Sequence, residues 1–386
     1  MSFSNSNIKK YPLLPYSRLV YDLTRWMPQV YSFNKTVRII DGAMAISKWQ
    51  ETIAKALNHH PVFRSCINWQ GKQFARPQKY ILCGRFHHFS FRINGDDLLI
   101  EACLNRILGD GRSIEILIED ISHAYRGEPL SPDDYWGYLE YVELQKQSKH
   151  YADSKAWLIN EFSDMSVPVR PALDKPLWTL FPPKAGQYME DYTDIKEAIN
   201  ELSETESLSL DGFFSLCTAF AIAEYCRTDE AALTWAYEGR ERVEEQRVYG
   251  SLHRDIPFHI HKSKIGNRDA AIREARNQIR FGIAHSDFPF TLTAPYNKRW
   301  NYAVNVLRVA DEQDLLKYLP AQVELLPSSP QKYAYSLLDV EILEGEHLYI
   351  NYRYSASHYK SHSIKKFAAL VRKYAKWLLE SEKIEK

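Results

Sequence analysis

The spacing of apolar residues in the first half of the chain predicts strands mixed with helices. Short apolar runs predict strands over 36–40, 62–69 and 98–104. Apolar residues at helical spacing predict helices from Ile46 to Pro61, from Ser113 to Gly127, over 135–146 and over 155–162. Ser113 suits an N-cap and Gly127 a helix C-terminus, so a strand, a loop and an amphipathic helix follow one another over 98–127.

The second half repeats this mixture after an irregular stretch. Residues 213–226 are apolar almost all round, which predicts a buried helix, and further helices are predicted over 268–284 and 365–379. Strands are expected over 233–237, 256–260, 302–309, 337–343 and 348–354. Residues 166–187 hold five prolines without a clean period. They predict a linker between an N-terminal lobe, 1–165, and a C-terminal lobe, 188–386, both of α/β (α+β) class.

Charge and composition exclude several classes of function. The 386 residues carry 49 Lys and Arg and 49 Asp and Glu, so bulk electrostatic binding of nucleic acid is not expected. The polar N-terminus lacks the apolar core of a signal peptide, and no apolar run is long enough to span a bilayer. We therefore expect a cytoplasmic protein with neither a nucleic-acid nor a membrane partner.

The cysteines and the common nucleotide motifs give no sign of a cofactor. The five cysteines, at 66, 83, 103, 217 and 226, form no CxxC pair, so small buried apolar side chains are expected rather than disulfides or zinc ligands. No Walker-type, GxGxxG or GxSxG motif occurs. Neither a metal site nor a bound cofactor is predicted.

Seven short motifs in a fixed order resemble the condensation domains of nonribosomal peptide synthetases, which belong to the chloramphenicol-acetyltransferase-like acyltransferases. NRILGDGRS at 105–113 is similar to the HHxxxDGxS signature of that family. The other six are YPLLP at 11–15, HPVFRS at 60–65, YWGYLEY at 135–141, Gly239-Arg240, GSLHRDIPFHI at 250–260 and HSDFPF at 285–290. Ser17 stands where the family usually has Gln.

The resemblance implies two α/β lobes arranged as a V around a central tunnel. Two carrier-protein-bound thioesters, each on a phosphopantetheine arm, would enter from opposite faces as substrates. By correspondence with the signature, Asp110 should pair with Arg240, and Gly111 should allow a tight backbone approach in the loop. Asn105 and Arg106 occupy the positions of the two signature histidines, the second of which assists attack by the acceptor amine in that family.

Arginine at position 106 changes the chemistry that this loop can perform. A guanidinium stays protonated below about pH 12 and cannot act as a general base. Arg106 could stabilise an oxyanion, bind a carboxylate or phosphate of a ligand, or simply pair with a nearby carboxylate.

Other polar residues of the motifs are weaker candidates. His253, Arg254 and Asp255 replace the family's residues in the strand motif and are candidates for lining the cleft. We expect structural or surface roles for the remaining histidines near the motifs, which are His87 and His88 on a loop, His123 on a helix, His285, and His59 and His60 as caps of a helix end.

Three functions remain open, and the sequence does not decide whether the chain is an enzyme. The first is an acyltransferase that forms an amide from a carrier-bound acyl or aminoacyl thioester; ester formation, which needs a base more, is disfavoured. The second is a non-catalytic domain that binds a carrier protein or recruits another biosynthetic enzyme. The third is an acyltransferase that takes acyl-CoA. Basic residues over 262–280 suit either a docking face for an acidic carrier protein or a solvated helix face.

Overall fold

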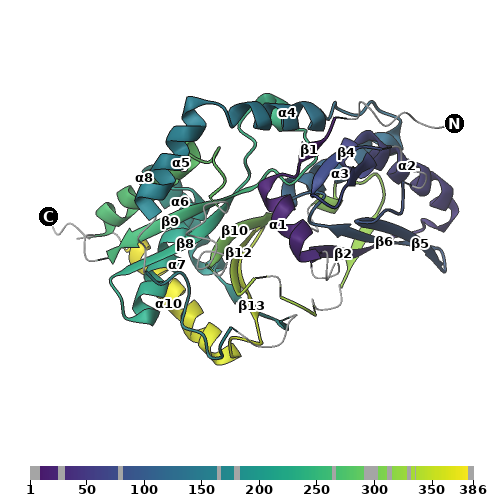
Figure 1. Cartoon of the computed structure of the whole chain (residues 1–386). Helices are drawn as coiled ribbons and strands as arrows, with labels where there is room; N and C mark the ends of the chain where they lie inside the picture. The colour runs from purple at the N-terminus through teal and green to yellow at the C-terminus, as the bar shows by residue number, and fades with distance from the viewer. Residues whose placement is uncertain are drawn as a thin grey trace. The chain divides into compact units, whose positions relative to one another are not determined.

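The computed structural model describes residues 9–24, 31–76, 81–162, 167–177, 183–262, 267–290, 303–310, 315–327, 332–334 and 336–380. They form two compact units, each built from separate stretches of chain (Figure 1). Unit 1 draws on Met1–Gln147, Glu238–His253 and Ala310–Pro330. Unit 2 draws on Ser148–Tyr237, Arg254–Val309 and Gln331–Lys386.

Unit 1 contains two antiparallel sheets and four α-helices among its described residues. The four-stranded sheet has the order β11-β2-β6-β5, and the three-stranded sheet has the order β1-β4-β3. Its elements are β1 (Tyr11–Pro12), α1 (Pro15–Thr24), β2 (Ser32–Ile39), α2 (Ile46–His59), β3 (Ser65–Ile67), β4 (Lys72–Ala75), β5 (His87–Asn94), β6 (Asp97–Asn105), α3 (Gly111–Arg126), α4 (Tyr135–Gln145) and β11 (Val323–Leu326).

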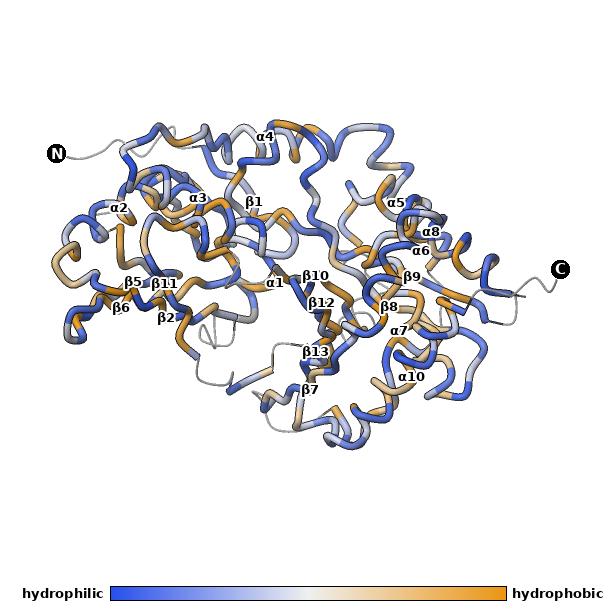
Figure 2. Tube along the Cα trace, turned by 180° about the vertical axis from the view of Figure 1, so that it is seen from behind, coloured by the Kyte–Doolittle hydropathy of each residue, from blue (hydrophilic) through white to orange (hydrophobic). Residues whose placement is uncertain are grey.

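Apolar residues of the strands pack against the apolar faces of α2 and α3 and form one core in unit 1. Apolar and polar residues alternate along most of β5, whereas β6 consists of two short apolar runs, as the colours of Figure 2 indicate. Leu98, Ile100 and Leu104 of β6 pack with Trp49 of α2 and Ile116 of α3 in a single buried cluster. The strand β6 pairs with β2 so that Asn105 lies opposite Ser32, which brings the end of β6 into the site described below.

Unit 2 contains a six-stranded sheet with the order β7-β13-β12-β10-β8-β9, in which β8 and β10 run parallel. Its elements are α5 (Lys149–Phe162), β7 (Ala185–Asp191), α6 (Lys196–Glu206), α7 (Leu210–Cys226), β8 (Glu230–Tyr237), β9 (Arg254–His261), α8 (Arg268–Ala284), β10 (Asn305–Ala310), β12 (Leu338–Glu344), β13 (Leu348–Ser355) and α10 (Ser361–Leu379).

Helix α7 is the centre of the unit 2 core, as its uniformly apolar sequence predicts. Phe213, Phe214 and Leu216 have no exposed surface, and they pack with residues of α10 and of the sheet strands. Among the described residues, no single helix is long and apolar enough to cross a membrane. The bent pair 193–206 and 210–226 meets that test by length and composition, but α7 is buried inside this core.

The mixed α/β class predicted from the sequence is confirmed, and the limits of several elements are corrected. The stretch predicted as a strand over 62–69 begins as a 3-10 helix, Pro61–Arg64, before β3. His87 and His88 lie in β5 rather than on a loop. The expectation that cysteines are buried is right for Cys217 and wrong for Cys83, which is exposed.

The two units divide the chain differently from the expected lobes 1–165 and 188–386 with a linker at 166–187. Helix α5 belongs to unit 2, and β7 begins within the expected linker. Residues 238–253, which join β8 to β9, belong to unit 1, and so does β11, which pairs with β2. Pairing between strands nearly 300 residues apart leaves no local trace in the sequence.

Candidate functional site

The loop between β6 and α3 is fixed at its start by the Asn105 side chain. Asn105 is buried, its Oδ1 accepts a hydrogen bond from the Ile107 N–H at 3.0 Å, and its Nδ2 donates to Ser32 Oγ at 3.4 Å. Ser17 Oγ donates to the carbonyl of Ile107 at 3.1 Å. Asn105 thus shapes the loop, and its neutral carboxamide cannot act as an acid or a base near neutral pH.

Arg106 lies at the first position of the loop, beside Tyr31, which precedes β2, and Phe33 of β2. Its backbone N–H donates to the carbonyl of Tyr31 at 2.7 Å. Its guanidinium carbon lies 4.6 Å from the centroid of the Phe33 ring, within the range of a cation–π contact, and the residue is partly exposed. The positively charged guanidinium therefore packs on Phe33, at the position that corresponds to the second histidine of the HHxxxDG signature.

Asp110 begins α3 as an N-cap. Its Oδ1 accepts from the Ser113 N–H at 3.0 Å, and Ser113 Oγ accepts in turn from the Asp110 N–H at 3.3 Å, which forms a capping box. The helix therefore starts at Gly111, and Ser113 is its third residue rather than its cap as the sequence suggested. Gly127 ends the helix in the left-handed conformation, as predicted.

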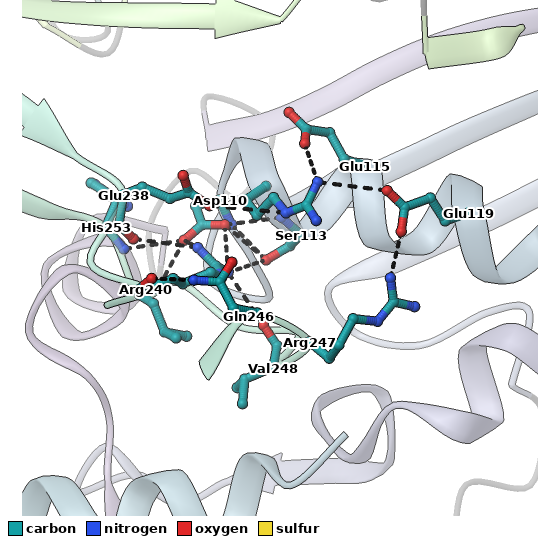
Figure 3. Close-up of polar contacts among 12 residues, drawn as sticks. Asp110, Ser113, Glu115, Glu119, Glu238, Arg240, Gln246, Arg247, Val248 and His253 are labelled. Carbon is teal, nitrogen blue, oxygen red and sulfur yellow. Dashed lines mark hydrogen bonds and ion pairs between the residues drawn. The ribbon is translucent and has the colours of Figure 1, made fainter. Parts of the chain in front are cut away.

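Asp110 and Arg240 form the ion pair that the resemblance implied (Figure 3). Arg240 Nη1 donates to Asp110 Oδ2 and Nη2 to Oδ1, both at 3.0 Å, which is a bidentate geometry. Arg240 belongs to residues 238–253, hereafter the crossing segment, which joins two strands of unit 2 and belongs to unit 1. This pair fixes one end of the crossing segment to the start of α3.

Further contacts between the crossing segment and α3 surround this pair. The backbone N–H groups of Leu252 and His253 donate to Asp110 Oδ2 at 2.8 and 3.1 Å. Ser113 Oγ bonds with both backbone groups of Gly250, at 2.8 Å to the carbonyl and 3.2 Å from the N–H. Sequence motifs pointed to Arg240, but no side-chain pattern could reveal the backbone donors of 252 and 253.

These contacts keep the Asp110 carboxylate ionised although it is buried. Burial alone would raise the pKa of this carboxyl group, but the Arg240 guanidinium, the nearby His253 and the donors around it lower the pKa below its ordinary value. The ionised form is thereby tied to folding, because only the folded chain supplies these partners.

This linkage predicts that acid weakens unit 1 through Asp110. A carboxyl group with a depressed folded pKa contributes stability above its unfolded pKa, about 3.8, and this contribution disappears as the pH falls through the folded pKa. The difference in free energy of unfolding between wild type and Asp110→Asn, followed by urea titration, should stay constant from pH 6 to about pH 4.5 and then shrink. A difference that does not change down to pH 3 would contradict this assignment.

The expectation that Gly111 permits a tight backbone approach is wrong. A Cβ atom built on Gly111 meets nothing within 4 Å, and its backbone is not in the left-handed region. The close approach is at Gly109, where a Cβ would lie 2.7 Å from Ser113 Cβ and 3.1 Å from Tyr249 Cε1. Gly109 gives the loop the room to bring Ser113 and the crossing segment together.

Two glycine substitutions therefore differ in effect. Gly109→Ala should lower the free energy of unfolding by about 1–3 kcal/mol, because Ser113 must move and its capping box must open. Gly111→Ala, the matched control two residues away, should change it by less than about 0.5 kcal/mol. Chemical denaturation of the two variants beside the wild type measures both values, and equal losses would contradict the assignment.

The three cleft-lining candidates make different contacts. In addition to its backbone contact with Asp110, His253 packs its ring 4.0 Å from the Tyr16 ring in unit 1. Arg254 starts β9 of unit 2 and donates to Ser286 Oγ at 2.7 Å and to Asp287 Oδ1 at 3.1 Å. Asp255 pairs with Ala236 along β8. Arg254 thus fixes the turn that carries the HSDFPF motif.

The remaining histidines of the motifs have structural surroundings. His87 is buried, its Nε2 lies 2.7 Å from the carbonyl of Ile81, and burial lowers its pKa. His123 forms a half-exposed ion pair with Glu128. His285 stacks on Trp157 at 4.6 Å and bonds to Ser154 Oγ. His60 does not cap carbonyls as expected; it is buried between two carboxylates.

The family model described as Condensation domain matches residues 85–381, most of the chain. The chain belongs to the condensation-domain family. The matched range includes the NRILGDG loop, Arg240 and the strand motif. Within this range, Asn105 and Arg106 differ from the two histidines of the HHxxxDG signature.

Two curated relatives are synthetases of the nonribosomal peptide type. The chain is 25% identical to the hybrid PKS-NRPS synthetase poxE of Penicillium oxalicum over 190 residues. This alignment covers 47% of this chain and 5% of the synthetase. Over 194 residues, 48% of this chain, it is 24% with tyrocidine synthase 3 of Brevibacillus parabrevis, of which 3% is covered. The chain therefore spans about a twentieth or less of the length of these curated relatives.

Solved structures of several condensation-type domains share this fold. The epimerization domain from the third module of tyrocidine synthetase B matches with a TM-score of 0.76 at 15% identity, over 98% of this chain and 99% of that one. The X-domain from teicoplanin biosynthesis gives 0.79 at 13%, over 97% and 96%. The condensation domain of the Monacolin K polyketide synthase MokA gives 0.77 at 12%, over 97% and 99%. At these identities the similarity shows the fold alone.

The basic stretch 262–280 is engaged inside unit 2 at several points. Arg268 Nε donates to the carbonyl of Leu378 at 2.6 Å, and Arg276 Nη1 donates to that of Glu206 at 2.8 Å. Lys262 Nζ donates to the Tyr374 hydroxyl at 2.7 Å. Such contacts favour a structural role for these side chains over the docking face considered from the sequence.

Proposed function

We propose that this condensation-domain protein of natural-product biosynthesis forms an amide bond from a carrier-bound acyl or aminoacyl thioester and an amine, without a histidine base. The observation that carries the proposal is the loop itself. Its scaffold, the Asp110–Arg240 pair, is intact, while Arg106 holds a positive charge against Phe33 at the position of the second signature histidine.

The chemistry of amide formation does not require a protein base. A neutral amine attacks the thioester carbon, the C–S bond breaks, and the thiolate of the phosphopantetheine arm leaves while water carries the amine's proton away. Alignment of two bound reactants can supply on the order of 7–11 kcal/mol, whereas a general base usually contributes only about 10²–10⁴-fold. Arg106 would stabilise the oxyanion of the tetrahedral intermediate by donating hydrogen bonds.

Intact-mass spectrometry of the carrier protein tests this function. A carrier loaded with an aminoacyl thioester is mixed with the full chain and an acceptor amine, which is free or bound to a second carrier. Amide product together with a free phosphopantetheine thiol supports the proposal. Transfer from an acyl-CoA donor alone would favour the CoA-dependent alternative, and an unchanged thioester with all acceptors tried would contradict the proposal.

The second candidate is a non-catalytic domain that binds a carrier protein or another biosynthetic enzyme. The observation in its favour is that the Asn105 side chain hydrogen-bonds to the loop backbone, and the Arg106 guanidinium contacts the Phe33 ring. One structural neighbour, the X-domain from teicoplanin biosynthesis, is known in a complex with OxyB. Stable binding of a carrier or tailoring enzyme in a pull-down, with no amide formed, would favour this candidate.

A further inference from the structure

A second group of buried charges lies along α3, about 15 Å beyond Asp110 by helical rise. His60, which follows α2, has no exposed surface. Its Nδ1 lies 2.8 Å from Asp133 Oδ2 in the loop before α4, and its Nε2 lies 3.2 Å from Asp120 Oδ2 on α3. The contact with Asp120 is within ion-pair distance but lacks the angle of a hydrogen bond.

The geometry of this group requires a protonated imidazole. Carboxylate oxygens only accept hydrogen bonds, and a neutral imidazole has a single N–H, so one of its nitrogens would face an anionic oxygen with a lone pair. Burial alone would lower the pKa of His60, but Asp120 and Asp133 together raise it above its ordinary value. The charged ring is therefore the form that fits this site.

The crossing segment is attached to the same group. Arg247 Nη2 donates to Asp120 Oδ1 at 2.5 Å, and Arg247 also pairs with Glu119, as Figure 3 shows. The Tyr249 ring packs 4.8 Å from the His60 ring. The crossing segment is thus held on α3 at two points, by Arg240 at the start of the helix and by Arg247 near its middle.

We propose that His60 is a pH-sensitive clasp, which holds the crossing segment on α3 while its ring is protonated and loosens it when the ring loses its proton. This inference goes beyond the proposed function and does not depend on it. The groups that face the ring are Asp120 from α3, Asp133 from the loop before α4, Tyr249 from the crossing segment and its neighbour His59.

The direction of the pH effect follows from these charges. With the ring protonated, His60 and Arg247 balance Asp120 and Asp133, and Arg112 gives Glu119 a second cationic partner at 3.6 Å. With the ring neutral, two buried carboxylates face one cation that is 25% exposed, and a buried unbalanced charge is costly. Because the folded pKa of His60 is raised, the stabilisation is complete below about pH 6.5 and is lost as the pH rises through the folded value.

Hydrogen–deuterium exchange of the full chain, read from peptides of 238–253 between pH 6 and 9.5, tests the clasp. After correction for the intrinsic rise of exchange with pH, protection in the wild type should be constant at low pH and fall at least tenfold at high pH. His60→Gln should lower protection of these peptides at every pH and remove its pH dependence. The control is His123→Gln, which breaks the half-exposed pair of His123, on α3, with Glu128. This variant should keep the wild-type profile.

A second variant keeps the proposal testable if His60→Gln does not fold. Asp133→Asn removes one of the two carboxylates, so the midpoint of the exchange transition should move to lower pH by about one unit. Histidine NMR of the wild type, with the His60 signal assigned from a variant, should show a charged ring at pH 6. A midpoint unmoved in Asp133→Asn, protection unchanged in a folded His60→Gln, or a neutral His60 ring at pH 6 would each overturn the proposal.

Discussion

Asp110→Asn should lower the free energy of unfolding of unit 1 by about 3–5 kcal/mol, which would be the largest effect of a single substitution in the site. The variant leaves the Arg240 guanidinium, with no exposed side-chain surface, beside a neutral amide. It also weakens the contacts that Asp110 Oδ2 accepts from the backbone of Leu252 and His253. Urea denaturation followed by tryptophan fluorescence gives this loss.

A double-mutant cycle with Arg240→Met separates the pair from its surroundings. Because the two charges are in direct contact, the double variant should lose less stability than the two single variants added together. The exposed pair of Arg18 and Asp22, four residues apart on α1, is the matched control, and Asp22→Asn should cost about 0.5 kcal/mol or less. Additive losses in the cycle would show that the two charges act independently, against the structure.

Arg106→Ala should lower the rate of amide formation by about 10²–10³-fold, as the loss of one oxyanion donor does elsewhere. The fold should survive, because Asn105 and Asp110 determine the loop and the Arg106 side chain is partly exposed. Arg106→Lys keeps the charge but not the planar donor array, so it should recover only part of the rate. Single-turnover assays under saturating carrier would measure both.

An unchanged rate in a folded Arg106→Ala would remove Arg106 from the mechanism. The residue would then be a structural replacement for histidine held by Phe33. Arg106→His provides a complementary comparison, since it restores the family's residue at that position. A higher rate with histidine than with arginine would show that the scaffold is competent and that a base was lost.

The parts of the fold that were predictable from the sequence are those set by local patterns. Helix α8 has the predicted limits, and α7 is buried, because caps and apolar periodicity along one segment determine both. The loop predicted at His87 and His88 is wrong, because both residues begin β5, in which Phe89, Phe91 and Ile93 alternate with polar residues. This alternation is a local pattern typical of a strand with one buried face.

In the site, the ion pair between two family motifs was predictable, whereas the other contacts between residues far apart in the sequence were not. The partnership of Asp110 with Arg240 followed from matching the motifs of a family, and the structure confirms it. The role given to Gly111 was wrong because the close approach occurs at Gly109, where a Cβ would meet Ser113 first and then Tyr249, which lies far along the chain. The environment of His60 likewise depends on Asp120 and Asp133, more than 55 residues away, and no spacing rule joins them.

The dependence of amide formation on pH tests most directly the claim that this domain works without a protein base. With a free α-amine as acceptor, the wild-type rate should rise tenfold per pH unit up to the amine's own pKa, about 8, without an inflection near 6.5. Under the same conditions, the rate profile of Arg106→His should show an additional inflection near pH 6.5, where the new histidine titrates. A wild-type profile with that inflection, or no amide at any pH, would contradict the account.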